Sequence, residues 1–307
     1  MKNERVKQPS KARSRMREIK RNGLLVNTLG IIPFVWASIM LFILLWGLEV
    51  AFADPNWYLA HNKSLLVEKF TLKNFGEAFR NFKQQISTSD GGFRWVGYGE
   101  MTLNTIWYSF GYTFTKMFST VCAAYAVARF DFPGRKWIHR FVIVQLMIPV
   151  YGQTAASYSL LMKMGLVDSP LFLLSTFAGH GMNFLIMYSF FRNLPSGYEE
   201  AAKMDGAGPF TIFSKVMLPL AKPIILAYTI MLLIGYWNEY EGVLIYLPSF
   251  PTLSSALYTI RSNAFYLGLQ TPAYFAGIFV SVIPVATVFI IFNKQIMSNV
   301  TIGGLKG

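Results

Sequence analysis

The sequence predicts an all-α protein that crosses a membrane six times. Hydrophobic residues make up 53% of the 307-residue chain and charged residues only 14%, whereas soluble proteins carry roughly 25% charged residues. Six apolar stretches are long enough to span a bilayer, which needs about 20 residues per helix. Lysine and arginine concentrate in alternate segments between these stretches, as they do in multi-pass proteins of the cell membrane.

The six predicted spans are expected at residues 24–48, 103–128, 137–162, 170–191, 223–247 and 273–292. Within the third span, Pro149 and Gly152 interrupt the apolar run. The chain is expected to have five parts, of which the fourth contains the last five spans. The five parts are a basic segment (1–22), the first span (23–52), an outer segment that forms a small cap or is irregular (53–100), a core with a long loop at 194–222 (101–294), and a tail (295–307).

The first span also has the features of a secretory signal peptide. A basic start precedes the apolar run, and "AFA" precedes Asp54 as a cleavage site would. The run is about 25 residues long, whereas the apolar region of a signal peptide has about 7–15. A retained helix is therefore favoured over a cleaved signal.

The distribution of positive charge predicts the orientation. Nine of the 28 Lys and Arg residues precede the first span. With the N-terminus inside, 19 lie in inner segments, eight in outer segments and Lys116 within a span, which places both termini in the cytoplasm. This placement explains the net charge of +13 by orientation and contact with anionic lipid, so no nucleic-acid partner is expected.

Nothing in the sequence predicts a catalytic centre. The single Cys122 and the scattered His61, His139 and His180 have no metal-ligand spacing. The chain contains no G-x-x-x-x-G-K-[ST] phosphate loop and no G-x-S-x-G or H-E-x-x-H motif. We expect a protein that is not an enzyme and holds no metal or cofactor of its own.

The loop at 194–222 predicts a short helix across the inner face. Ser196 can cap it, Glu199 and Glu200 suit the positive end of its dipole, and "DGAGP" from Asp205 ends it. Such a helix is suited to a groove on a partner protein. The alternative is an amphipathic helix that lies on the membrane without a partner.

The spacing in this loop resembles the EAA motif of ABC-importer permeases, which reads E-A-A, three residues, G, nine residues, I, one residue, L-P. The sequence departs from it only at Val216, where isoleucine is usual. The resemblance implies the ABC-importer permease fold, with this loop as the coupling helix that docks on a cytoplasmic ATPase. The residues it assigns to coupling are Glu199, Glu200, Ala201, Ala202, Asp205 and Gly206.

Other stretches resemble the maltose-type permease subunits of carbohydrate importers. They are "AAYAVARFDFPGRK" (123–136), the turn "GLVDSP" and the tail "IGGLKG". The resemblance covers about residues 100–307 and implies transport of carbohydrate, with oligosaccharide as the expected substrate. It also implies a second homologous permease, an extracellular solute-binding protein, and two ATPase subunits that bind the ATP and Mg²⁺. A non-sugar solute is the alternative.

The fifth span carries the candidate substrate pathway. Aromatic faces and carboxylate or amide groups together suit sugar rings and hydroxyls, although an aromatic belt at the outer interface has the same composition. Helical spacing allows Asn238 and Glu241 to share a face. The candidates are Tyr236, Trp237, Asn238, Glu239, Tyr240 and Glu241.

Charged and polar groups inside spans support a second hypothesis. Lys116, His180 and Glu239 would form the ion or proton relay of a secondary transporter that needs no ATPase. Lys116 could instead pair with a partner subunit or face a water-filled cavity, and His180, between two glycines, could be a packing residue. A membrane enzyme, the third hypothesis, lacks a nucleophile or metal site.

Overall fold

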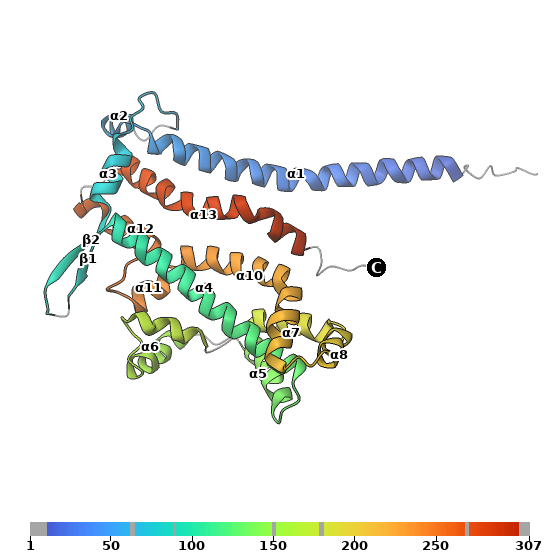
Figure 1. The fold of residues 1–307 in the computed structure, drawn as a ribbon. Coiled ribbons are helices and arrows are strands. Elements are labelled where there is room, and N and C mark those ends of the chain that lie inside the picture. The colour runs from blue at the N-terminus through green and yellow to red at the C-terminus, as the bar shows by residue number, and fades with distance from the viewer. Residues whose placement is uncertain are drawn as a thin grey trace, which may run out of the picture.

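The structure is a computed structural model that describes residues 11–61, 65–88, 90–148, 152–177, 181–267 and 270–300. This part of the chain forms an elongated bundle of helices with a small hairpin at one end (Figure 1). The first half consists of α1 (Lys11–Ala51), α2 (Pro55–Ala60), α3 (Lys73–Asn81), β1 (Lys83–Ser87), β2 (Phe93–Gly97) and α4 (Tyr98–Arg129). The second half consists of α5 (Arg135–Met147), α6 (Gln153–Lys163), η1 (Pro170–Phe177), α7 (Gly181–Asn193), α8 (Gly197–Met204), α9 (Pro209–Ile212), η2 (Phe213–Met217), α10 (Leu218–Asn238), α11 (Glu241–Tyr246), α12 (Leu253–Leu267) and α13 (Thr271–Val300).

The mostly helical, membrane-type fold expected from the sequence is confirmed at this level. Among the described residues, three helices are long and apolar enough to cross a membrane, at Gly30–Ala51, Pro209–Asn238 and Thr271–Phe292. A fourth crossing results if η1 and α7, which meet at an angle of 55°, are counted as one span. The structure thus has several apolar crossings, and the expected total of six stays a prediction.

Long helices set the direction of the bundle. α1 and α13 run antiparallel, side by side, and the start of α1, the end of α13 and α8 lie toward the same side of Figure 1. α2, α3 and the hairpin lie at the opposite side. Large apolar side chains of α1, such as Ile32 and Phe34, are exposed, as expected of a helix that faces lipid.

The described part of residues 53–100 forms a cap that contains α2, α3 and a hairpin absent from the all-α prediction. β1 and β2 pair antiparallel, from Lys83 opposite Gly97 to Ser87 opposite Phe93. Asn74, in α3, is buried and donates from Nδ2 to the carbonyls of Ala51 and Ala53, which ties the cap to the end of α1. Two five-residue strands give too short a period-two pattern to stand out beside the long helical runs.

α4 is the central helix of the bundle and contacts three separate core clusters. Near its start, Met101 packs with Phe82 and Trp237. In its middle, Tyr108 packs with Phe172 of η1, and its last four turns join a cluster with α7 and the start of α10. A single helix therefore connects the hairpin end of the molecule to the α8 end.

Three of the predicted spans are broken helices. The third divides into α5 and α6, and Gly152, at φ +74°, precedes α6; Pro149 lies outside the described residues. The fourth bends between η1 and α7. The fifth breaks between α10 and α11 because Glu239 is extended, at ψ 123°, which corrects the expectation of one helix over 223–247.

Candidate functional site

The first candidate region is the α8 loop, residues 194–222. α8 ends at the predicted turn: Gly206 has φ +77°, its N–H donates to the Lys203 carbonyl, and the Ala207 N–H donates to the Ala202 carbonyl. This pair of bonds is a Schellman motif, which favours glycine at the left-handed position. The expected side-chain cap at Ser196 is wrong, because only its backbone carbonyl accepts the Glu199 and Glu200 N–H groups.

Neighbouring carboxylates in α8 face different surroundings. Glu199 Oε1 lies 3.4 Å from Arg129 Nε at the end of α4, and the two side chains are only 14% and 11% exposed. Glu200 is exposed. Ala202 packs against the core cluster, whereas Ala201 and Asp205 are exposed. The loop therefore has one face on the bundle and one face free of it.

The free face of this loop carries large apolar side chains. Met204 is 88% exposed and Phe210 is 79% exposed, and Tyr198 is about half exposed. Sequence reasoning missed these three residues because the EAA spacing assigns them no role. Together with Glu200 they form a mixed surface of the kind that docks into a protein groove.

The second candidate region is the aromatic cluster, defined as Tyr108, Tyr112, Phe172, Tyr236 and Tyr246. The Tyr112 and Tyr236 rings are 4.4 Å apart, Tyr112 and Phe172 are 5.9 Å apart, and Phe172 and Tyr246 are 5.3 Å apart. Four elements, α4, η1, α10 and α11, meet here. Tyr108 and Tyr112 were missed by sequence reasoning, although their spacing of four places both on one face of a helix.

Three predicted pathway residues have distinct environments next to this cluster. Trp237 is buried and its indole N–H donates to the Ser281 carbonyl, 3.2 Å away. Asn238 is exposed and donates to the Ile234 carbonyl. Glu239 Oε1 accepts the Gly242 N–H at 2.7 Å, which stabilises the break between α10 and α11.

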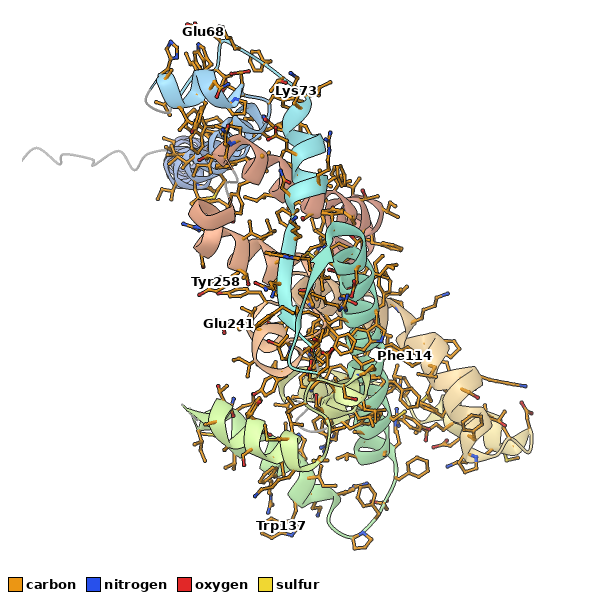
Figure 2. All side chains as sticks on the ribbon, turned by 90° about the vertical axis from the view of Figure 1, so that its left-hand side faces the viewer. Glu68, Lys73, Phe114, Trp137, Glu241 and Tyr258 are labelled. Carbon is orange, nitrogen blue, oxygen red and sulfur yellow. The ribbon has the colours of Figure 1, made fainter. Side chains whose placement is uncertain are left out.

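Tyr240 and Glu241 lie just beyond the break. The Tyr240 ring stacks on Tyr258 at 4.9 Å, and its hydroxyl donates to Glu241 Oε1 at 3.3 Å. Figure 2 shows Glu241 and Tyr258 on one side of the molecule and Phe114 of α4 on the other. Since the helix is broken, helical spacing does not relate Asn238 to Glu241.

The groups considered for a relay lie on different elements of the bundle. Lys116 Nζ lies 3.5 Å from the Thr176 carbonyl at the end of η1, and Glu239 holds a backbone N–H of its own loop. His180 lies outside the described residues. A cation beside the last carbonyls of η1 suits the negative end of the helix dipole.

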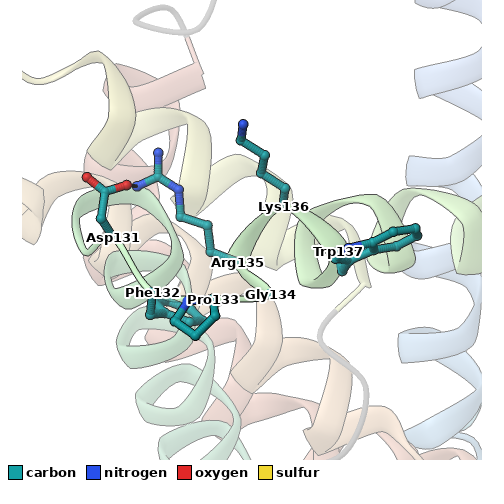
Figure 3. A pocket seen from close by; sticks show the side chains of 7 residues that line it. All are labelled: Asp131, Phe132, Pro133, Gly134, Arg135, Lys136 and Trp137. Atoms are coloured by element: carbon teal, nitrogen blue, oxygen red, sulfur yellow. Dashed lines mark ion pairs between the residues drawn. The ribbon is translucent and has the colours of Figure 1, made fainter.

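A shallow hollow of about 530 Å³ lies on the loop between α4 and α5 (Figure 3). It is lined by residues 131–137, and Gly134 makes the turn at φ +92°. Arg135 pairs with Asp131 across the hollow. Among the residues that the structure describes, no three His, Cys, Asp or Glu side chains form a metal-type cluster.

Comparison with known proteins identifies related chains. The family described as "Binding-protein-dependent transport system inner membrane component" matches residues 117–300. The diacetylchitobiose uptake system permease protein of Streptomyces coelicolor is 28% identical over 280 residues, which is 89% of this chain and 86% of that protein. The maltodextrin transport system permease protein of Bacillus subtilis is 32% identical over 190 residues, 60% of this chain and 67% of that protein.

A solved structure has the same fold. It comes from a bacterial ABC transporter involved in the import of the acidic polysaccharide alginate, and it covers 94% of this chain and 99% of its own, with a TM-score of 0.69 and 22% identity. The apolar helices and the family match together make this a multi-pass protein of the cell membrane. The chain belongs to the family of inner membrane components of binding-protein-dependent transport systems.

Proposed function

We propose that this chain is the transmembrane permease subunit of an ABC importer that carries carbohydrate, specifically oligosaccharide, into the cell. The observation that carries the proposal is the α8 loop, whose E-A-A to L-P spacing and exposed Glu200, Met204 and Phe210 combine on one polar segment between apolar helices. The names of the related proteins, which refer to diacetylchitobiose and maltodextrin, support the substrate class.

The proposed topology has six spans with both termini inside. The broken helices pair as α5 with α6, η1 with α7, and α10 with α11, so that six crossings follow from α1, α4, these three pairs and α13. The start of α1, the end of α13 and α8 lie toward one side (Figure 1), which agrees with the excess of Lys and Arg in the inner segments. In this topology α2, α3 and the hairpin form the outer part of residues 53–100.

The proposed partners are those of an importer complex. Two ATPase subunits bind at the inner face, one of them through the α8 loop of this chain, and hold ATP and Mg²⁺, so this chain is not itself an enzyme. A second homologous permease completes the path, and an extracellular solute-binding protein delivers the sugar. Exposed Glu200 supplies the carboxylate contact, Ala201 permits close approach, and Gly206 with Asp205 turns the chain back toward the membrane.

The proposed substrate path runs beside the aromatic cluster. Tyr236 belongs to the cluster, and Asn238, Glu239, Tyr240 and Glu241 follow it at the break between α10 and α11. Aromatic faces bind sugar rings, and the amide and carboxylate groups bind hydroxyls. Trp237 has a buried ring and a satisfied N–H, so it packs behind the path residues and does not contact the sugar.

In this mechanism ATP shifts the bundle between outward-facing and inward-facing states. A ligand shifts an equilibrium only if it binds the two states differently. The ATPase pair does so by closing on ATP and moving the two coupling helices that it holds. The bundle then opens outward, and it returns to the inward-facing state when the ATPase pair reopens.

Purification tests the assignment to ABC importers. The chain, tagged and expressed in its own host, should co-purify with an ATPase, and Glu200→Ala should lower the yield of bound ATPase and abolish most uptake. Lys163→Ala, a charge removed at the opposite side of the core, is the matched control. A wild-type chain that retains no ATPase would contradict the proposal.

Uptake of a defined panel tests the substrate class. Cells with and without the chain are given labelled maltotriose, diacetylchitobiose, trehalose and an amino acid, each at the same concentration. Deletion should abolish uptake of at least one oligosaccharide and leave amino-acid uptake intact. Asn238→Ala should weaken the same uptake while the complex still assembles, whereas unchanged uptake of all sugars on deletion would contradict the carbohydrate assignment.

A further inference from the structure

We infer that Arg129 is a positioning residue that joins α8 to the end of α4, so that the α8 loop and the central helix move as one body. The inference rests on the proposed function of the α8 loop. It concerns a step that the EAA spacing does not address, namely how movement of α8 reaches the substrate path. Three contacts carry it.

The first contact is the buried ion pair. Arg129 Nε and Glu199 Oε1 are 3.4 Å apart, with side chains 11% and 14% exposed, and both of these atoms are buried. Two charges removed from water attract each other strongly, and loss of either partner leaves the other uncompensated. The Glu199 side chain therefore binds within the bundle, to Arg129 of α4, whereas its neighbour Glu200 is exposed.

The second contact uses another nitrogen of the same guanidinium. Arg129 Nη2 donates to the carbonyl of Leu194, the residue that follows α7. The guanidinium therefore makes an ion pair with the Glu199 carboxylate at 3.4 Å through Nε and a hydrogen bond to Leu194 through Nη2. One side chain thus connects the last turn of α4, the end of α7 and the first turn of α8.

The third contact is aromatic packing beside the ion pair. The Tyr125 ring, one turn before Arg129, lies 5.4 Å from Phe191 of α7 and 4.7 Å from Phe213 of η2. The buried core here also contains Met217 and Ala221. The helix before the loop, α7, and the helix after α9, η2, are therefore both packed on α4.

α4 then carries the movement toward the substrate path. It is continuous from Tyr98 to Arg129, and about 1.5 Å of rise per residue puts Tyr108 some 32 Å from Arg129. Tyr108 and Tyr112 belong to the aromatic cluster. In this proposal a displacement of α8 reaches the aromatic cluster along one continuous helix.

The test needs no knowledge of the natural sugar. A single reporter cysteine, Tyr112→Cys in a Cys122→Ser chain, is labelled with a water-soluble maleimide in the purified complex, with and without ATP and Mg²⁺. Arg129→Ala and Glu199→Gln should retain the ATPase subunits but lose at least half of the ATP-dependent change in labelling rate. A full change in an Arg129→Ala complex with its ATPase bound would overturn the inference.

Two further variants separate positioning from simple stability. If Arg129→Ala does not assemble, Glu199→Gln decides alone, since it keeps the size of the side chain and leaves the bond from Arg129 to Leu194 possible. The double variant Arg129→Ala/Glu199→Ala should be no worse than Arg129→Ala, because two residues that act as a unit are not additive. Additive losses would overturn the inference.

The matched control is the other arginine pair close by in the chain, Arg135 with Asp131, which is more exposed, with side chains 34% and 91% accessible. Arg135→Ala removes the same charge and should leave the ATP-dependent change in labelling rate intact. An equal loss in Arg135→Ala would overturn a specific role for Arg129.

The failure of the proposed function has a different outcome. A reporter chain with both Arg129 and Glu199 unchanged that binds no ATPase contradicts the proposed function itself. Cell uptake measured with Tyr112 unchanged should fall in Arg129→Ala and not in Arg135→Ala.

Discussion

The two ends of α4 each carry an Arg–Glu pair, and the two pairs differ in burial rather than in chemistry. At the first turn Arg94 and Glu100 are 2.6 Å apart, with side chains 47% and 41% exposed. At the last turn Arg129 and Glu199 are 3.4 Å apart but only 11% and 14% exposed. The shorter pair faces water, which screens it, so distance alone is a poor guide to the effect of losing a partner.

The surroundings of the two pairs explain why one joins moving parts and the other does not. Arg94 lies on β2, and β2 leads directly into α4 in the chain. The Arg94–Glu100 pair therefore joins two elements that the backbone already connects. Arg129 and Glu199 are 70 residues apart in sequence. Their pair makes a connection that the chain itself does not make.

Arg129→Ala should destabilise the protein far more than Arg94→Ala. The mostly buried carboxylate of Glu199 would lose its partner; breaking a fully buried pair costs about 3–5 kcal/mol, which is the upper bound here, whereas an exposed pair contributes about 0.2–1 kcal/mol. Thermal unfolding of the detergent-purified complex measures both. Equal shifts in the midpoint for the two variants would break the comparison.

Gly277→Ala should destabilise the hairpin end of the bundle. A Cβ at Gly277 would lie 2.7 Å from Cε2 of the fully buried Phe82 ring, and overpacking of this kind costs about 1–3 kcal/mol. Gly111→Ala is the control, since its Cβ would lie 2.7 Å from Leu173 Cδ1, the end of a side chain that can rotate away. The same unfolding assay should give the smaller shift for Gly111→Ala.

Gly206→Ala should weaken the end of α8 without affecting the hairpin. A non-glycine residue at φ +77° costs about 1–2 kcal/mol. Gly208→Ala is the control, because Gly208 has φ −71° and its Cβ would meet open space. Faster hydrogen exchange across α8 in Gly206→Ala alone is the expected result, and equal exchange in both variants would argue against the Schellman turn.

The Arg94–Glu100 pair should have a small effect on stability that depends on pH. The hydrogen bond from Arg94 holds the pKa of Glu100 below its usual value. A carboxyl with a lowered folded-state pKa contributes stability above its unfolded pKa, and that contribution disappears as the pH falls through the folded-state pKa. The difference in unfolding free energy between wild type and Arg94→Ala should therefore vanish in acid; a difference independent of pH would mean that the pair acts through packing.

Sequence reasoning reached the local features of this molecule and missed those that depend on distant contacts. The end of α8 at Gly206 follows from glycine chemistry within a few residues. The partner of Glu199 could not be found in this way, since Arg129 lies in a different helix. The break at Glu239 was missed because apolar and aromatic residues at 230–237 and 243–247 continue the pattern of a span on both sides of a short polar stretch.

The length of α1 has a consequence for the basic N-terminal segment. Its apolar run begins at Leu24, yet the helix begins at Lys11. At about 1.5 Å per residue, the 13 residues from Lys11 to Gly23 continue the helix for some 20 Å before the apolar run. Inserting a single residue near Gly23 would therefore rotate this whole basic stretch of α1 by about 100° relative to the bundle.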